Sequence, residues 1–252
     1  MSYICSAMTA IQHINEFAGR RNADFSKKEL VEHLITCGIT ASSTEKALQR
    51  LVQSGNIEKG SGRGLYRNAL NRKPEFIVSP SEGLAALYEQ IKKEFPLLEI
   101  VALDIHAIMP LMHHIPNVKM TLLYAEKDGF SDVADTLETI TDKLVFRNPS
   151  RNDLVHLAFG RDFIVIRPLV SQSPVESCKG VRCPKIEKIL VDILCDEEFY
   201  YLQGNETYEI YKTALADYSI NQKALIRYAG RRSATEIVKQ IIKTIKDDTS
   251  GE

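Results

Sequence analysis

The sequence predicts a mixed α/β protein, α+β in its overall arrangement, built from two parts. Residues 1–73 show three helical segments followed by a hairpin pattern, whereas residues 97–169 alternate apolar strand-like runs with helical patterns. The last third of the chain reads as helix throughout. We therefore expect a winged helix-turn-helix domain over residues 1–73, a connector helix over 74–96, and an α/β domain with a helical C-terminus over 97–252.

The first two helices are predicted by apolar spacing and by a capping signal. Ile11, Ile14 and Phe17 recur at helical spacing and predict a first helix that ends near Gly19. Residues 26–29 read Ser-Lys-Lys-Glu, a capping box in which the serine hydroxyl and the glutamate satisfy each other's backbone amides. This box predicts a second helix that ends at Gly38, a residue suited to a left-handed C-terminal position.

A third helix is expected directly after the second. Residues 42–45 form another capping box, Leu48, Leu51 and Val52 supply a core face, and Gly55 ends the pattern. Only about five residues join the two helices, and so short a connection forces them to cross steeply, as in helix-turn-helix units.

The segment after Gly55 is typical of a wing. Residues 56–59 predict a short strand, residues 60–64 (Gly-Ser-Gly-Arg-Gly) predict a turn, and residues 65–67 predict a return strand. Arg63 would lie at the tip of this hairpin, where glycines allow the backbone to approach a phosphate closely. The same glycines lack the Lys-Ser/Thr of a P-loop and the following apolar helix of a dinucleotide-binding turn.

Charge and side-chain chemistry predict that this domain binds double-stranded DNA. Residues 1–73 contain 11 Lys/Arg and 6 Asp/Glu, a net charge of +5, and the rest contain 21 and 27, a net charge of −6. Arg and Gln on the outer face of the third helix read guanine and adenine edges in the major groove, and the helix start and wing suit phosphates. The predicted contact residues are Ser42, Ser43, Thr44, Lys46, Gln49, Arg50, Gln53, Lys59, Arg63 and Arg67. The alternative is a solvated face on a winged helix that binds protein.

The remainder of the chain predicts a sheet followed by helices. A helix is expected after Ser79, ending near Pro96. Strands are expected at residues 97–105, 119–125, 144–148 and 163–169, with helices at 108–114, 131–139 and 151–159 between them. The C-terminal helices are expected from Pro184, placed in the first turn, through residues 186–194, then at 205–218, 221–230 and 233–246.

Two C-terminal segments carry a resemblance to known proteins. Residues 181–192, Val-Arg-Cys-Pro-Lys-Ile-Glu-Lys-Ile-Leu-Val-Asp, resemble the connector and helix of AbiEi-type antitoxins. Residues 218–221, with residues 225–232, resemble the C-terminal signature of a related bacterial family of unknown function that also begins with a winged helix. Residues 98–104 and 145–149 fit strands of the same family.

The resemblance implies a transcriptional regulator. It would be the antitoxin of a type IV toxin–antitoxin system, which represses its own promoter and has a nucleotidyltransferase-like toxin as its cognate partner. The second domain would be similar to a degenerate nucleotidyltransferase fold that does not carry out the transfer.

The residues themselves disfavour nucleotidyl transfer. That reaction needs two or three carboxylates to hold divalent metal ions, and no Asp-x-Asp pair occurs in the chain. Asp104 lies near a strand end but is followed by Ile105 and His106. We therefore expect no enzyme activity, no cofactor and no metal site. Two alternatives stay open: a nucleotidyltransferase-like enzyme fused to a winged helix, and a winged-helix adaptor that binds protein.

Several other residues have competing interpretations. Arg227, Arg231 and Arg232 form either a patch for an acidic partner or polyanion or a solvated helix end. Lys188 and Asp192 are expected to form a simple i,i+4 pair worth a few tenths of a kcal/mol. His113 and His114 are adjacent and are not expected to chelate one metal.

The remaining signals concern compartment. The five cysteines (Cys5, Cys37, Cys178, Cys183 and Cys195) lack a disulfide or zinc spacing, so reduced structural thiols are expected. The chain has no apolar run of about 18 residues and no basic segment before an apolar run at its start. We expect a cytoplasmic protein without a membrane span.

Overall fold

The computed structural model describes residues 9–21, 23–60, 62–69, 73–114, 117–157 and 161–250, without the side chains of the last two. The chain divides into two compact units, unit 1 over Met1–Lys73 and unit 2 over Pro74–Glu252. Each unit is described by itself. Cys5, Ser61 of the predicted turn and Phe159 at the end of a predicted helix lie outside the described residues.

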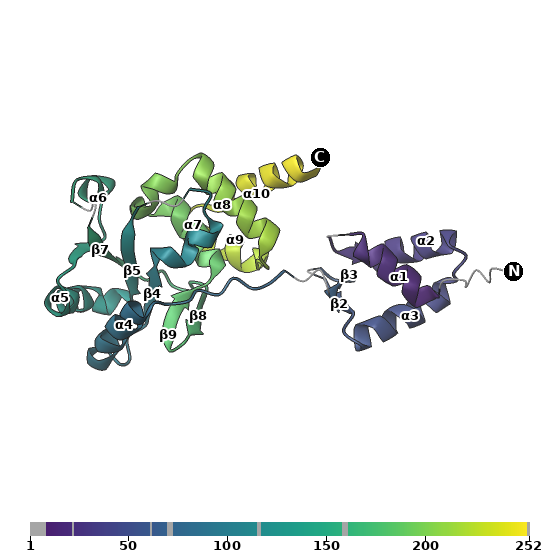
Figure 1. Cartoon of the computed structure of the whole chain (residues 1–252), viewed down its shortest axis with the longest axis horizontal. Coiled ribbons are helices and arrows are strands. Elements are labelled where there is room, and N and C mark those ends of the chain that lie inside the picture. Colours follow the sequence, from purple (N-terminus) through teal and green to yellow (C-terminus); the bar gives the residue numbers. More distant parts are fainter. Residues whose placement is uncertain are drawn as a thin grey trace, which may run out of the picture. The chain divides into compact units, whose positions relative to one another are not determined.

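Unit 1 combines three helices with a small antiparallel sheet (Figure 1). The helices are α1 (Ala10–Gly19), α2 (Lys27–Thr36) and α3 (Ala41–Gln53), and the strands are β1 (Phe25–Ser26), β2 (Ile57–Lys59) and β3 (Leu65–Asn68). The sheet order is β1-β3-β2, so β2 and β3 form the predicted hairpin and β1 adds an edge strand that the sequence did not reveal. The capping box of Ser26 and Glu29 is present at the start of α2.

The start of α3 differs from the prediction. Thr40, rather than Ser42, is the N-cap residue, and its hydroxyl accepts a hydrogen bond from the amide of Ser43 at 3.3 Å. The predicted box at residues 42–45 was therefore wrong by two positions, because Thr40 satisfies the free amides one half-turn earlier. The hydrophobic core of unit 1 includes Ile14, Phe25, Leu30, Leu34 and Ile57, each with an exposed fraction of 1% or less.

Unit 2 contains a four-stranded sheet, a two-stranded hairpin and a set of helices. Its first half comprises α4 (Glu82–Glu94), β4 (Ile100–Asp104), the 3₁₀ helix η2 (Ile105–Leu111), β5 (Lys119–Ala125), η3 (Lys127–Gly129), α5 (Phe130–Ile140), β6 (Leu144–Arg147), α6 (Arg151–Leu157) and β7 (Asp162–Pro168). Its second half comprises β8 (Val175–Cys178), β9 (Val181–Pro184), α7 (Ile186–Cys195), η4 (Glu197–Leu202), α8 (Asn205–Asp217), α9 (Gln222–Arg231) and α10 (Thr235–Ser250).

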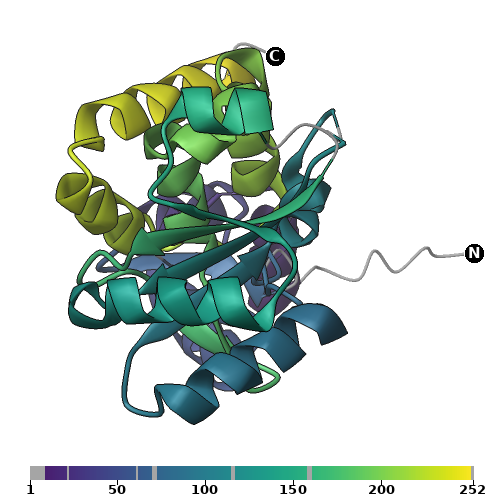
Figure 2. The same ribbon diagram turned by 90° about the vertical axis from the view of Figure 1, so that its left-hand side faces the viewer.

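The larger sheet has the order β4-β5-β7-β6 and is mixed. β5, β6 and β7 run parallel to one another, and β4 is antiparallel to β5. Consequently the C-terminal end of β4 meets the N-terminal ends of the three parallel strands at one edge of the sheet. Figure 2 shows α4 and α5 on one face of this sheet and the C-terminal helices on the other.

Two local features differ from the predictions. Residues 108–114 were expected as a helix, but the segment is the 3₁₀ helix η2, which contains Pro110; proline removes an amide donor and clashes with the preceding turn of an α-helix. Pro184 was placed in a first helical turn, but it ends β9 and pairs with Val175. The β8–β9 hairpin turns through Lys179 and Gly180, at φ 49° and 84°, as a two-residue type I′ turn requires.

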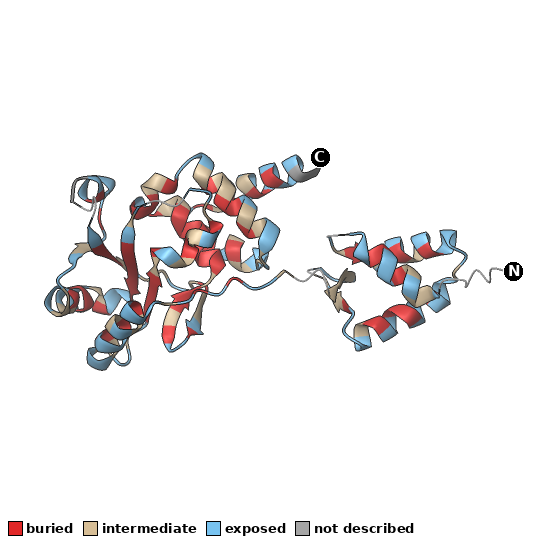
Figure 3. Ribbon diagram, in the orientation of Figure 1, coloured by how far each residue is buried: buried red, intermediate tan, exposed pale blue. Residues whose placement is uncertain are grey.

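α7 is the central helix of unit 2. Eight of its ten residues are buried, including the charged residues Lys188 and Asp192. Figure 3 shows α7 coloured largely as buried, whereas α10 carries exposed residues along part of its length. Of the helices in the described part of the chain, none combines the length and the hydropathy needed to cross a bilayer.

Candidate nucleic-acid interface

The outer face of α3 is polar and accessible. Lys46, Gln49, Arg50 and Gln53 are all exposed, as the sequence predicted. The opposite face of the helix packs into the core of unit 1 through Ala47, Leu48 and Leu51, with Val52 half-buried. The buried residues fix the rotation of α3, so its four polar side chains form one row that faces solvent.

The first turn of α3 holds two exposed hydroxyls and a buried one. Ser42 and Ser43 are exposed, and the hydroxyl of Ser43 accepts a hydrogen bond from the hydroxyl of Thr40 at 3.0 Å. Thr44 was predicted to contact phosphate, but it is fully buried and its hydroxyl donates to the carbonyl of Thr40 at 3.1 Å. The prediction for Thr44 was wrong because the helix starts two residues earlier and turns this side chain inward.

The β2–β3 hairpin carries the other predicted cations. Lys59 and Arg63 are exposed, and Gly64 takes a left-handed conformation, with φ 77°, directly after Arg63. Arg67 is half-buried and lies 3.7 Å from Glu58, its cross-strand partner. Arg67 therefore forms an ion pair within the hairpin. Lys59 and Arg63 are the predicted cations that the hairpin exposes to solvent.

Some basic residues of unit 1 form ion pairs with carboxylates and others do not. Five basic residues each lie within 4 Å of a carboxylate: Arg20–Glu16, Arg21–Glu29 at 3.7 Å, Lys27–Glu45 at 2.6 Å, Lys28–Glu32 at 3.9 Å and Arg67–Glu58 at 3.7 Å. Within the described part of the unit, Lys46, Arg50, Lys59 and Arg63 have no such partner. The excess positive charge therefore belongs to α3 and the hairpin, the two elements that the sequence singled out for DNA.

The three predicted C-terminal arginines separate in the structure. Arg227 and Arg231 are exposed, and the guanidinium of Arg231 donates to the hydroxyl of Ser171. The side chain of Arg232 is only 15% exposed and pairs with the carboxylates of Asp192 on α7 and of Asp196, the C-cap residue of that helix. Arg232 is therefore not part of a surface patch, and Arg227 and Arg231 alone remain from the predicted set.

Arg232 belongs to a buried ionic network that the sequence did not reveal. Lys188 Nζ lies 2.5 Å from Asp192 Oδ2 and 3.4 Å from the centre of the Tyr124 ring. Asp192 Oδ1 accepts the hydroxyl proton of Tyr228 at 2.9 Å and lies 3.5 Å from Arg232 Nη1. The expectation of a weak surface pair was wrong, because Lys188 and Asp192 have side-chain exposures of 0% and 2%.

The network extends to the larger sheet through β7. Arg167 Nε and Nη2 donate to the carboxylate of Glu198 at 2.5–2.8 Å, and Nε lies 3.7 Å from Asp196 Oδ1. With Lys188 and Arg232, three cations thus meet the three anions Asp192, Asp196 and Glu198. The opposite charges attract one another and so offset part of the cost of burying them.

Burial perturbs the ionisation of this network. Desolvation, together with the charges of Asp192 and Glu198, raises the pKa of Asp196 to about 7, although Arg232 and Arg167 act against the rise. Among the described residues, Asp196 Oδ2 is buried without a hydrogen-bond partner. Burial also lowers the pKa of Lys188, while Asp192 acts in the opposite direction.

Asp104, the strand-end carboxylate considered for catalysis, is held by neutral donors. Its Oδ2 accepts hydrogen bonds from the hydroxyl and the amide of Ser81, at 2.5 and 3.4 Å, and its Oδ1 accepts one from Thr121 Oγ1 at 3.0 Å. Because Ser81 is the N-cap of α4, Asp104 fixes the start of that helix against β4. Among the described residues, no group of three or more His, Cys, Asp or Glu is placed to hold a metal ion.

The adjacent histidines His113 and His114 are held by a carboxylate of α8. Glu206 accepts hydrogen bonds from the backbone amides of His113 and His114, at 2.7 and 3.1 Å, so these two residues are held at the start of α8.

Cys178 and Cys183 are buried free thiols on the β8–β9 hairpin, and burial raises the pKa of Cys183 to about 12. These two thiols are therefore not activated as nucleophiles.

Comparison with known proteins gives one family match. None of the curated proteins matches this chain. A family of unknown function, DUF6577, matches residues 43–248, a span that begins within α3 and ends within α10. Because the match covers most of the sequence, including the outer face of α3, the hairpin and the buried ionic network, the chain belongs to the family of unknown function DUF6577.

Proposed function

We propose that the protein is a transcriptional regulator that binds double-stranded DNA through unit 1, with α3 in the major groove and the β2–β3 hairpin as a wing. The observation that carries this proposal is the placement of the uncompensated cations. Lys46 and Arg50 lie on the outer row of α3, and Lys59 and Arg63 lie on the hairpin. Three helices followed by a hairpin support the winged-helix interpretation.

The chemistry of the α3 row favours DNA over a protein partner. Arg and Gln side chains make bidentate hydrogen bonds with guanine and adenine, respectively, and Arg50 and Gln49 are adjacent on the exposed row. Protein-binding interfaces are instead centred on apolar and aromatic side chains. The α3 row contains none, since its four exposed members are Lys, Gln, Arg and Gln.

The first experiment measures binding of the full chain to a random-sequence duplex as a function of salt. Each phosphate contact contributes about −0.9 to the slope of log K against log salt concentration. We expect Lys59→Gln and Arg63→Gln, on the hairpin proposed to contact phosphates, to reduce the magnitude of the slope by about one contact each. The matched control is Lys28→Gln on α2, an exposed lysine already paired with Glu32, which should leave the slope unchanged. An equal reduction of the salt slope in all three variants would mean that only the total charge matters, and it would contradict the proposal.

The resemblance to AbiEi-type antitoxins supports a narrower proposal. We propose that the protein represses its own promoter and neutralises a nucleotidyltransferase-like toxin encoded beside it. The test is co-expression of the adjacent gene, which should arrest growth alone and lose that effect when this chain is supplied. An adjacent gene that is harmless alone would contradict the antitoxin role and leave a solitary regulator.

We propose no nucleotidyl transfer by unit 2. Asp104 supports this view because its carboxylate is occupied by Ser81 and Thr121. We expect no magnesium-dependent label transfer from any of the four nucleoside triphosphates to RNA or protein. Transfer abolished by Asp104→Ala would instead promote the enzyme alternative.

A further inference from the structure

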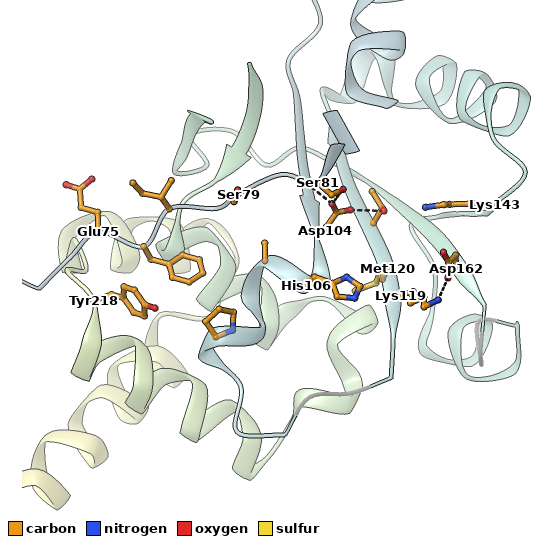
Figure 4. A pocket seen from close by; sticks show the side chains of 15 residues that line it. Glu75, Ser79, Ser81, Asp104, His106, Lys119, Met120, Lys143, Asp162 and Tyr218 are labelled. Carbon is orange, nitrogen blue, oxygen red and sulfur yellow. Dashed lines mark hydrogen bonds and ion pairs between the residues drawn. The ribbon is translucent and has the colours of Figure 1, made fainter. Parts of the chain in front are cut away.

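Unit 2 contains an open pocket of about 770 Å³ at the edge of the sheet where β4 ends and the three parallel strands begin. Its walls come from the extended segment before α4, from η2, and from the first residues of β5 and β7. The pocket holds three chemically different regions: an aromatic end that includes Tyr218, the carboxylate of Asp104 and the ammonium group of Lys143, which follow one another from left to right in Figure 4. None of them takes part in the proposed DNA interface.

The aromatic end is formed by Phe76 and Tyr218, whose rings meet edge to face with their centres 5.0 Å apart. Pro110 and Ile77 also line the pocket, and Ile77 is 65% exposed. An exposed isoleucine beside two aromatic rings offers apolar surface that a ligand would remove from water.

The carboxylate is that of Asp104. It accepts three hydrogen bonds, all from the neutral donors of Ser81 and Thr121. A carboxylate has about four lone-pair sites, so one acceptor position remains open. No cation of the described chain pairs with Asp104, so its negative charge is uncompensated within the pocket.

The ammonium group is that of Lys143, which directly precedes β6. Lys143 is exposed, and its charged end points toward the middle of the pocket in Figure 4. The neighbouring Lys119 is paired with Asp162 at 3.6 Å, whereas Lys143 has no ion pair among the described residues. Of the other polar groups in the pocket, His106 and Glu75 are exposed, and Ser79 accepts a hydrogen bond from Lys179 at 3.3 Å.

We propose that this pocket binds a free α-amino acid with a large apolar side chain. The ligand ammonium would occupy the open acceptor position of Asp104, the ligand carboxylate would pair with Lys143, and the side chain would cover Phe76 and Tyr218. A purely anionic ligand would face Asp104 without compensation, and a purely cationic one would face Lys143 in the same way. Only a zwitterion satisfies both charges with charge-assisted hydrogen bonds.

The binding test uses the full chain, titrated with L-phenylalanine and L-leucine and followed by calorimetry. Phenylacetate lacks the ammonium group and phenethylamine lacks the carboxylate, and each should bind at least about tenfold more weakly than L-phenylalanine. Failure of both amino acids to bind at concentrations up to about 10 mM would overturn the proposal. So would equal binding of phenylacetate, which would indicate a site for organic anions.

Substitutions test whether Asp104 and Lys143 contact the ligand. Asp104→Asn should weaken L-phenylalanine binding by about tenfold without weakening phenylacetate binding, whereas Lys143→Gln should weaken L-phenylalanine binding without weakening phenethylamine binding. The control is Lys93→Gln on α4, an exposed lysine paired with Glu89 at 2.9 Å, which should bind L-phenylalanine as the native chain does. If Asp104→Asn fails to fold, Lys143→Gln still decides, because Lys143 is exposed and only its backbone amide, which donates to the Thr141 hydroxyl at 3.2 Å, is held in place. Unchanged binding in Lys143→Gln would overturn the proposal. DNA binding without ligand is measured separately, so failure here leaves the proposed function standing.

Discussion

Arg232 Nη1, at the end of α9, lies 3.5 Å from Asp192 Oδ1 on α7. The two residues come from the two C-terminal segments that resemble antitoxin proteins, residues 181–192 and 225–232. Lys188 and Tyr228 connect the same segments through Asp192. Lys188, Asp192, Tyr228 and Arg232 thus hold α7 and α9 together and belong to the packing of unit 2.

Arg232→Met should destabilise unit 2 strongly. It would leave Asp192 and Asp196 buried without their shared cation, and breaking a buried pair from one side costs about 3–5 kcal/mol. Arg227→Met is the matched control, since Arg227 lies one and a half turns earlier on the same helix and is exposed, and it should change stability by no more than about 0.5 kcal/mol. Urea denaturation followed by circular dichroism measures both. Equal, small effects would show that the network contributes little.

Lys188 and Asp192 should prove strongly coupled. Lys188→Met alone leaves a buried carboxylate short of one cation, and Asp192→Leu alone leaves a buried ammonium without its carboxylate. We expect the double variant to lose less free energy of unfolding than the two single variants added together, by about 1–3 kcal/mol. Strict additivity in this double-mutant cycle would mean that the two side chains do not depend on each other.

The stability of unit 2 should fall as pH rises from about 4 to about 7. The unfolded carboxyl of Asp196 ionises near its ordinary pKa of about 3.9, while in the folded protein the pKa is about 7. The folded state therefore holds a proton that the unfolded state has lost, and this advantage disappears as pH passes through 7. Asp196→Asn cannot ionise, so the difference in unfolding free energy between native chain and variant should vary over this pH range and level off above it. A difference independent of pH would contradict the assignment.

The sequence was sufficient where the determinants are local. The Ser26–Glu29 capping box depends on residues three apart and the β2–β3 hairpin on a short turn between neighbouring strands, and both are present. β5 lies at the predicted residues 119–125 because both its faces are buried, which gives a continuous apolar run. The outer row of α3 was also predicted, since the buried row opposite fixes it.

The sequence was insufficient where distant residues decide. Arg167, Glu198 and Arg232 are far apart along the chain, so no spacing pattern announces that they meet Asp196 in the interior. Lys188 and Asp192 have the spacing of an ordinary surface pair, and only the packing of α9 and the sheet around α7 distinguishes the two cases. Thr44 was misplaced for a smaller reason: Thr40 and Ser42 are both good N-caps, and the structure uses the first.

Within unit 1, we expect α3 to read the base sequence and the β2–β3 hairpin to contact phosphates. Arg50 and Gln49 face outward from α3, and loss of a bidentate contact costs about 1–3 kcal/mol at the cognate base. Arg50→Ala and Gln49→Ala should therefore abolish the preference for the cognate operator over random DNA. Arg63→Ala, at the hairpin tip, should weaken both duplexes equally, because phosphate contacts carry no sequence information. Competition binding with the two duplexes at fixed salt measures the ratio. If Arg63→Ala changed the ratio and Arg50→Ala did not, the hairpin rather than α3 would be the reading element.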